Sequence, residues 1–154
     1  MIWVTGLSQR SLARCLLADT SETEEIPMNI ALWIATALLA ALALFGGITK
    51  AFVPREKLAA SPGGEWTASA GDGFVKGLGV LQILAAVGLT LPAVLGIAPV
   101  MVPVTAVCWV GLMVGAMITH GRLGEYKFVV LNSVYLAVAV FIAWGRFALE
   151  PFTS

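Results

Sequence analysis

Four long apolar blocks, each about as long as a helix that crosses a membrane, constrain this chain more than any other feature. They run from Asn29 to Thr49, from about Phe74 to Leu91, from about Val100 to Thr119 and from about Tyr126 to Trp144. About 20 residues of α-helix cross the roughly 30 Å hydrocarbon core of a bilayer. The sequence therefore predicts an all-α fold, an antiparallel bundle of four transmembrane helices.

The composition supports a lipid environment and argues against charged partners. Hydrophobic residues make up 59% of the chain and charged residues 12%, whereas soluble domains carry about 45–50% and about 25%. Nine basic residues balance nine acidic ones, so the chain offers no basic surface to a nucleic acid. We expect the lipid bilayer, and no nucleic acid, as a partner.

Few residues are suited to redox or metal chemistry. Cys15 and Cys108 are far apart in the sequence, and a thiol–disulfide carrier needs a vicinal pair. We expect Cys108 to be a small buried hydrophobe. His120 is the single histidine, which disfavours a bis-histidine haem and a zinc site. The sequence thus predicts no metal and no cofactor, and without a catalytic motif we assign no enzymatic activity.

The chain divides into three parts by composition. Residues 1–27 contain no spanning apolar run and are predicted to form a poorly ordered tail. Met28 leads directly into the first block, so we also consider it as the true start of the protein. Residues 28–147 form the predicted membrane domain, and residues 148–154 a C-terminal tail.

The links between the blocks predict how the helices follow one another. Residues 51–72 contain prolines and glycines and are expected to form an interfacial loop. Within it, residues 55–60 are predicted to form a short helix, and Trp66 to anchor at headgroup level. Residues 92–99 are expected to form a tight turn, which makes the second and third helices antiparallel neighbours.

Basic residues near the helix ends predict the orientation in the membrane. The links after the first and third blocks carry most of them: Lys50, Arg55, Lys57, Lys76, Arg122 and Lys127. The opposite side carries Arg10, Arg14 and Arg146. We therefore expect both basic links in the cytoplasm and both termini outside.

Gln82 is a polar residue near the middle of the second block. An amide at that depth needs a hydrogen-bond partner, because lipid offers none. The sequence leaves two interpretations open: an interhelical hydrogen bond that fixes packing, or an amide that binds a ligand in a cavity of the bundle.

Lys50, Lys76 and His120 are expected on the same side of the membrane. The two lysines can extend along the helices to reach the interface. His120 follows Thr119 at the end of the third block, where the helix dipole favours an imidazolium. The alternative is a cluster that binds an anionic headgroup, a quinone carbonyl or a small anion, with His120 handling a proton.

Asn132 and Tyr135 lie one helical turn apart in the fourth block and are expected to face the interior, bonded to Gln82 or Lys76. Small residues mark faces on which helices pack closely. The glycines predicted to serve this purpose are Gly46, Gly47, Gly73, Gly77, Gly79, Gly111 and Gly115.

Four motifs in order carry a resemblance to a known family. FGGITK ends the first block, GFVKGLGVLQILAAVGLTLP forms the second, GAMITHGRLGEYK ends the third, and LN lies early in the fourth. Over about residues 29–146 the chain resembles the DoxX-like family of small membrane proteins. The family's signature positions would fall on Gly47, Lys50, Lys76, Gly77, Gln82, His120 and Asn132.

This resemblance implies a four-helix integral membrane protein, often of the bacterial cytoplasmic membrane. It also implies an association, in some relatives, with membrane oxidoreductase complexes, thiol redox and quinones. One departure is Gln82, where an acidic residue is expected in the family's pattern. Glutamine can hydrogen-bond but cannot trade a proton, which weakens a proton-coupled interpretation.

Three functions follow as hypotheses. The preferred one is a subunit that binds a quinone, another small ligand or a lipid, in contact with a membrane redox protein. The second is a small-molecule transporter or exporter, although the spans lack the carboxylate on which coupling usually relies. The third is a structural membrane partner, and a homo-oligomer is compatible with each.

Overall fold

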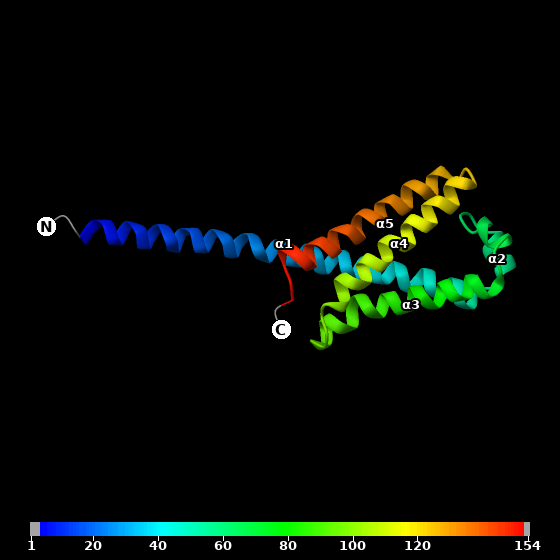
Figure 1. Cartoon of the computed structure of the whole chain (residues 1–154), viewed down its shortest axis with the longest axis horizontal. Coiled ribbons are helices and arrows are strands. Elements are labelled where there is room, and N and C mark those ends of the chain that lie inside the picture. Colours follow the sequence, from blue (N-terminus) through cyan, green and yellow to red (C-terminus); the bar gives the residue numbers. More distant parts are fainter. Residues whose placement is uncertain (1–3, 153–154) are drawn as a thin grey trace.

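The computed structural model describes residues 4–152, with side chains from residue 27 onward, and it is built from helices (Figure 1). The elements in chain order are α1 (Val4–Phe52), α2 (Arg55–Ala59), the 3-10 turn η1 (Glu65–Ala68), α3 (Asp72–Leu95), α4 (Met101–Arg122), α5 (Tyr126–Trp144) and the π-helical turn η2 (Gly145–Leu149).

Four of these helices are long and apolar enough to cross a membrane. The segments are Pro27–Phe52, Asp72–Leu95, Met101–Arg122 and Tyr126–Leu149. Large apolar side chains cover their outer surface, as at Phe45 and Val94, which are 72% and 69% exposed. Such a surface suits lipid tails, which are as apolar as the side chains themselves. The predicted all-α bundle of four transmembrane helices is confirmed.

The bundle consists of two helix pairs. α1 packs mainly against α3 and α4 mainly against α5, while α3 also contacts α4 and α1 also contacts α5. The N-terminal part of α1 extends beyond the other helices (Figure 1). Where the pairs meet they bury a common core, which includes Leu39, Ala43, Ala86, Leu89, Ala106, Trp109, Met113 and Ile142.

The backbones of α1 and α3 touch at two of the predicted packing glycines. A methyl group on Gly79 would lie 2.6 Å from the amide nitrogen of Ala51 and 2.8 Å from the carbonyl oxygen of Gly47. A methyl group on Gly47 would lie 2.8 Å from the carbonyl oxygen of Gly79. Only glycine permits so close an approach.

Four other glycines do not pack against a helix of the described chain. A methyl group on Gly73, Gly77, Gly111 or Gly115 would meet no atom within 4 Å. The spacing GxxxG indicates a face without side chains, but it does not say whether a neighbour fills it. For these four positions the packing prediction is wrong within one chain.

The helix ends differ from the predicted ones in two places. α3 continues through Pro92 to Leu95 and ends where Gly96 adopts a left-handed φ of 66°. A glycine in this conformation terminates a helix well, so the turn is shorter than the predicted residues 92–99. α4 likewise continues to Arg122, which places His120 inside its last turn. The fourth predicted helix and the short α2 match closely.

Cys108 corrects another expectation, because its side chain is exposed on the outside of α4 instead of buried. α1 begins at residue 4, inside the predicted tail. The side chains of residues 1–26 lie outside the described part. The order of residues 1–27 therefore stays a prediction.

Candidate functional site

A cavity of about 510 Å³ lies at the end of the bundle where α1 ends and α3 begins. Its walls come from all four spans and from the link between α1 and α3. The lining residues are Thr49, Lys50, Leu58, Ser61, Pro62, Gly63, Gly64, Trp66, Thr67, Phe74, Leu78, Gln82, Gly111, Leu112, Met113, Gly115, Ala116, Thr119, His120 and Asn132.

The two helix pairs diverge towards this end of the bundle, and the segment that contains α2 lies beside them (Figure 1). Residues of both pairs and of this segment line the cavity. Hydrogen bonds fix this segment: Arg55 Nη1 donates to the Ala70 carbonyl oxygen at 2.8 Å, and Thr67 Oγ1 to that of Gly64 at 2.7 Å. Gly63 turns with a left-handed φ of 79°, directly against the ring of Phe128. The link between α1 and α3 is thus a wall of the cavity that hydrogen bonds and packing hold in place.

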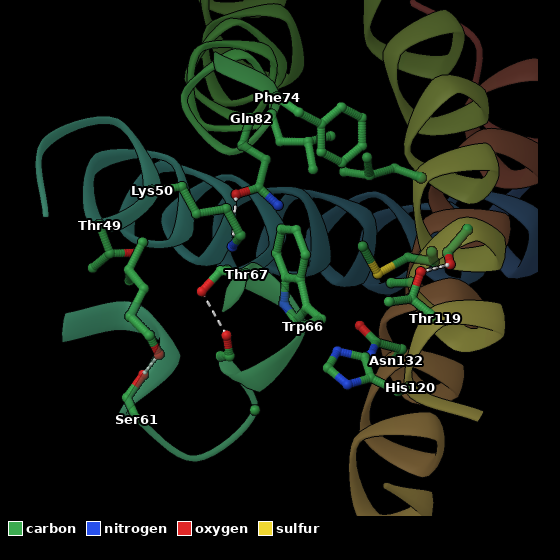
Figure 2. Close-up of a pocket in the computed structure, with 18 of the residues that line it drawn as sticks. Thr49, Lys50, Ser61, Trp66, Thr67, Phe74, Gln82, Thr119, His120 and Asn132 are labelled. Carbon is green, nitrogen blue, oxygen red and sulfur yellow. Dashed lines mark hydrogen bonds between the residues drawn. The ribbon is translucent and has the colours of Figure 1, made fainter. Parts of the chain in front are cut away.

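Lys50 reaches into this cavity from the last turn of α1. Its Nζ donates to Gln82 Oε1 at 3.2 Å and to the Gly46 carbonyl oxygen at 3.4 Å. Figure 2 shows the amide nitrogen of Gln82 pointing away from this bond, towards Trp66. The hydrogen bond joins α1 to α3, as the interhelical interpretation of Gln82 predicts, while its atoms still border the cavity.

His120 forms a second polar site on the α4 side of the cavity (Figure 2). It is 7% exposed, its Nδ1 lies 2.5 Å from Glu125 Oε2, and its ring lies 5.2 Å from the ring of Phe128. This carboxylate orients the imidazole ring. Glu125 was not among the residues predicted from the sequence. The signal for it is its position just beyond the end of α4, within reach of His120 in the last turn of that helix.

Glu65 adds another carboxylate near this end of the bundle. The pKa of Glu65 is lowered mainly because its carboxylate accepts a hydrogen bond from its own backbone N–H. The Glu125 side chain and the charge of His120 lower this pKa further, while desolvation opposes them. Among the described residues, no carboxylate lines the cavity.

Asn132 lines the cavity as well, but its Nδ2 donates to the Phe128 carbonyl oxygen of its own helix at 2.8 Å. The predicted bond from Asn132 or Tyr135 to Gln82 or Lys76 is therefore wrong. Gln82 accepts from Lys50 instead, and Lys76 pairs with Asp72. Tyr135 packs against the apolar core and does not line the cavity.

Lys76 also lies away from the cavity. Its Nζ pairs with Asp72 at 2.9 Å, and both side chains are 56% exposed. The structure thus brings Lys50 and His120 to one cavity but leaves Lys76 outside. Asp72, four residues earlier on the same helix, is a sequence signal for this pairing.

Trp66 and the loop around it are the main lining residues that sequence reasoning missed. Trp66 was expected to anchor at headgroup level, whereas its ring lines the cavity beside Gln82 (Figure 2). Thr49, Thr67 and Thr119 also line it, each bonded to a backbone carbonyl. No periodic pattern marks Trp66 or the other lining residues of its loop, so the sequence offers no signal for them.

The arrangement suits a ligand with an apolar body and an acceptor oxygen. Trp66, Phe74 and Leu78 offer apolar surface, Lys50 a cation and Gln82 an amide. Among the residues that the structure describes, no group of three His, Cys, Asp or Glu side chains could hold a metal ion. The chemistry available is hydrogen bonding and charge, with a histidine at one wall.

Comparison with curated proteins and with solved structures gives no match. The model of the DoxX-like family matches residues 34–142, which include the second and third spans, most of the first and fourth, and the residues that line the cavity. Together with the four apolar helices, this match shows that the chain belongs to the DoxX-like family of multi-pass membrane proteins.

Proposed function

We propose that the cavity binds a small ligand with an apolar body and a carbonyl or anionic oxygen, such as a quinone or a lipid. The observation that carries this proposal is the Lys50 ammonium, which borders the cavity without a carboxylate among the described lining residues.

Hydrogen-bond accounting supports a ligand at Lys50. An ammonium has three donors, and two of them are directed at Gln82 and at the Gly46 carbonyl. Both acceptors are neutral, so the positive charge is not compensated within the site. A partly buried cation is costly without a charged or strongly polar partner. A ligand oxygen beside Lys50 would take the third donor, and the Gln82 amide nitrogen could donate to the same oxygen.

The biological setting is also part of the proposal. We place the protein in the bacterial cytoplasmic membrane as a subunit of a redox complex, with the links that carry Lys50 and Arg122 in the cytoplasm. The cavity then opens towards the cytoplasmic leaflet, where a quinone or lipid reaches it from the bilayer. Family membership and the basic links support this setting.

Two matched lysine variants test the ligand site. Lys50→Met removes the cation from the cavity, whereas Lys76→Met removes an exposed cation on the neighbouring helix. We expect Lys50→Met to weaken binding of a short-chain quinone about tenfold, as the loss of a charged hydrogen bond does. Lys76→Met should bind like the unmodified chain.

Tryptophan fluorescence provides the measurement, because quinones quench indole emission and Trp66 lines the cavity. Trp66→Phe should remove the part of the quenching that saturates with ligand. Equal quinone affinity for both lysine variants would overturn the site. A bound lipid that resists quinone, identified by native mass spectrometry and lost in Lys50→Met, would assign the same cavity to lipid.

Purification from native membranes tests the remaining parts. A redox protein should co-purify in mild detergent, and its absence would contradict the role as a subunit. A reporter that functions only outside the cytoplasm should give a signal when it is fused to Ser154, and a silent reporter would contradict the proposed orientation. Substrate counterflow in liposomes would instead indicate a transporter, and the same Lys50→Met variant would show whether it uses this cavity.

A further inference from the structure

Arg146 lies at the opposite end of the bundle from the cavity and is nearly enclosed. It is part of η2, and only 4% of it is exposed. Its Nη1 donates to the Glu150 carbonyl oxygen at 3.3 Å, but its Nε and Nη2 are buried and have no hydrogen-bond partner among the residues that the structure describes. This arginine is therefore the buried group of the described chain with the largest unmet demand for acceptors.

Two aromatic rings hold the guanidinium in place. The ring centre of Phe152 lies 4.2 Å from its central carbon and that of Trp33 lies 5.5 Å away. The two rings also contact each other edge to face at 6.0 Å. Such rings stabilise the positive charge through their faces, but they do not accept hydrogen bonds from the in-plane N–H groups.

The backbone around Arg146 explains why this side chain is inside. Gly145 packs directly against the side chain of Leu32, where any methyl group would clash. The backbone N–H of Glu150 donates to the Gly145 carbonyl oxygen at 2.8 Å, five residues back, which widens the last turn. This turn keeps Arg146 beside Trp33 of α1 instead of towards the lipid.

Residues 150–152 follow η2 without helical structure. Among the described residues, they provide the cover over Arg146, because the ring of Phe152 lies against the guanidinium. Arg146 itself lies in the last turn of the span Tyr126–Leu149. The end of a span is at the depth of lipid headgroups, so phosphate groups surround this position in a bilayer.

We propose that Arg146 binds a phosphate group when Phe152 moves away from the guanidinium. A phosphate supplies several acceptor oxygens in the plane of the fork, and bidentate pairing of this kind is the characteristic use of arginine. Nε and Nη2 are adjacent donors and would bind two oxygens of one phosphate. The site is separate from the cavity and does not depend on the function proposed for it.

The phosphate could belong to a lipid headgroup or be free in solution, and the test separates these sources. Full-length protein in detergent is titrated with phosphatidylglycerol, with diacylglycerol, which has no phosphate, and with inorganic phosphate. Bound molecules are counted by native mass spectrometry. We expect the protein to retain phosphatidylglycerol but not diacylglycerol. Displacement of phosphatidylglycerol by inorganic phosphate would show that the site also binds free phosphate.

Three variants make the test specific to Arg146. Arg146→Gln removes the charge and should weaken phosphatidylglycerol binding about tenfold. Phe152→Ala removes the cover and should strengthen the same binding severalfold. Lys76→Gln removes an exposed cation and should leave it unchanged. If Arg146→Gln does not fold, Arg146→Lys keeps a cation without the fork and should bind weakly.

The proposal fails if Arg146→Gln or Arg146→Lys retains phosphatidylglycerol like the unmodified chain. It also fails if Phe152→Ala leaves the binding unchanged, because the cover would then have no role. Retention of diacylglycerol equal to that of phosphatidylglycerol would show that acyl chains, not a phosphate, are recognised.

Discussion

The contact between α1 and α3 and the cavity wall formed by α4 both contain glycine pairs, but the pairs serve opposite purposes. At Gly47 and Gly79 the missing side chains let two backbones touch. At Gly111 and Gly115 a methyl group would meet open space, and the missing side chains leave room for the cavity. The same residue type therefore closes one region of the bundle and opens another.

This difference teaches that small residues in a membrane helix mark absent volume, and the neighbouring helices decide how that volume is used. Where α1 and α3 run together, the volume is consumed by close packing. Where the helix pairs diverge, it remains open as part of the cavity. The two regions should therefore respond differently to added side-chain volume.

The largest expected effect is that of Gly79→Ala. The added methyl group would lie 2.6 Å from a backbone nitrogen of α1, so the helices must move apart. We expect the free energy of unfolding to fall by about 1–3 kcal/mol, as overpacking typically costs. The control is Gly77→Ala on the same helix, which faces open space and should gain up to about 1 kcal/mol from helix propensity.

Denaturation in detergent followed by circular dichroism would measure both variants. Similar unfolding curves for Gly79→Ala and Gly77→Ala would show that the α1–α3 contact is not close in solution. The two glycine regions would then not differ in how they respond to added volume.

A smaller effect is expected from Gln82→Leu, which removes the hydrogen bond that joins α1 to α3. Interhelical hydrogen bonds in membranes contribute about 0.6 kcal/mol on average and up to about 2 kcal/mol, and the Lys50 ammonium loses an acceptor. We expect a loss of stability within this range, measured as for Gly79→Ala. Gln82→Glu provides Lys50 with a charged partner and should retain the link, so an equal loss in both variants would contradict this role.

Gly115→Leu should leave stability nearly unchanged and affect the cavity instead. Its side chain would enter open space, so the free energy of unfolding should change by no more than about 0.5 kcal/mol. The same side chain fills part of the cavity, and quinone quenching of Trp66 should require about tenfold more ligand. Full quenching at unchanged ligand concentration would show that the α4 wall does not limit the site.

The smallest effect concerns the loop that covers the cavity. The pKa of Glu65 is lowered from its ordinary value of 4.5, so the unfolded chain binds the proton more readily than the folded one. The stability from Glu65 is therefore present above pH 4.5 and is lost as the pH falls through the folded pKa. Melting curves on either side of this pH should show a small loss that is absent in Glu65→Gln.

The fold was predictable because hydropathy alone locates spanning helices. The fourth helix matches its predicted bounds at Tyr126 and Trp144. The end of α3 was less predictable, since Pro92 suggests a break that the helix tolerates until Gly96 ends it. Pro92 has no backbone N–H to donate to the carbonyl oxygen of Gly88, four residues back, so α3 passes through it with the loss of one hydrogen bond.

The candidate site was predictable only in its polar residues. Gln82 is unusual within an apolar block, Lys50 and His120 each directly follow one, and the structure brings all three to the cavity. Lys76 has the same sequence signature but pairs with Asp72 outside it. Trp66 reaches the cavity through the fold of an irregular loop, for which no sequence pattern exists.

The contact of Gly47 with Gly79 is made by main-chain atoms, and this has a consequence for how such proteins diverge. Selection cannot exchange either residue for another, because every alternative is larger. The cavity wall is under no such steric constraint, since a methyl group added at Gly111 or Gly115 meets no neighbouring atom of the described chain. Descendants of one ancestral chain can therefore vary the lining of the cavity by single substitutions while inheriting the same helical frame.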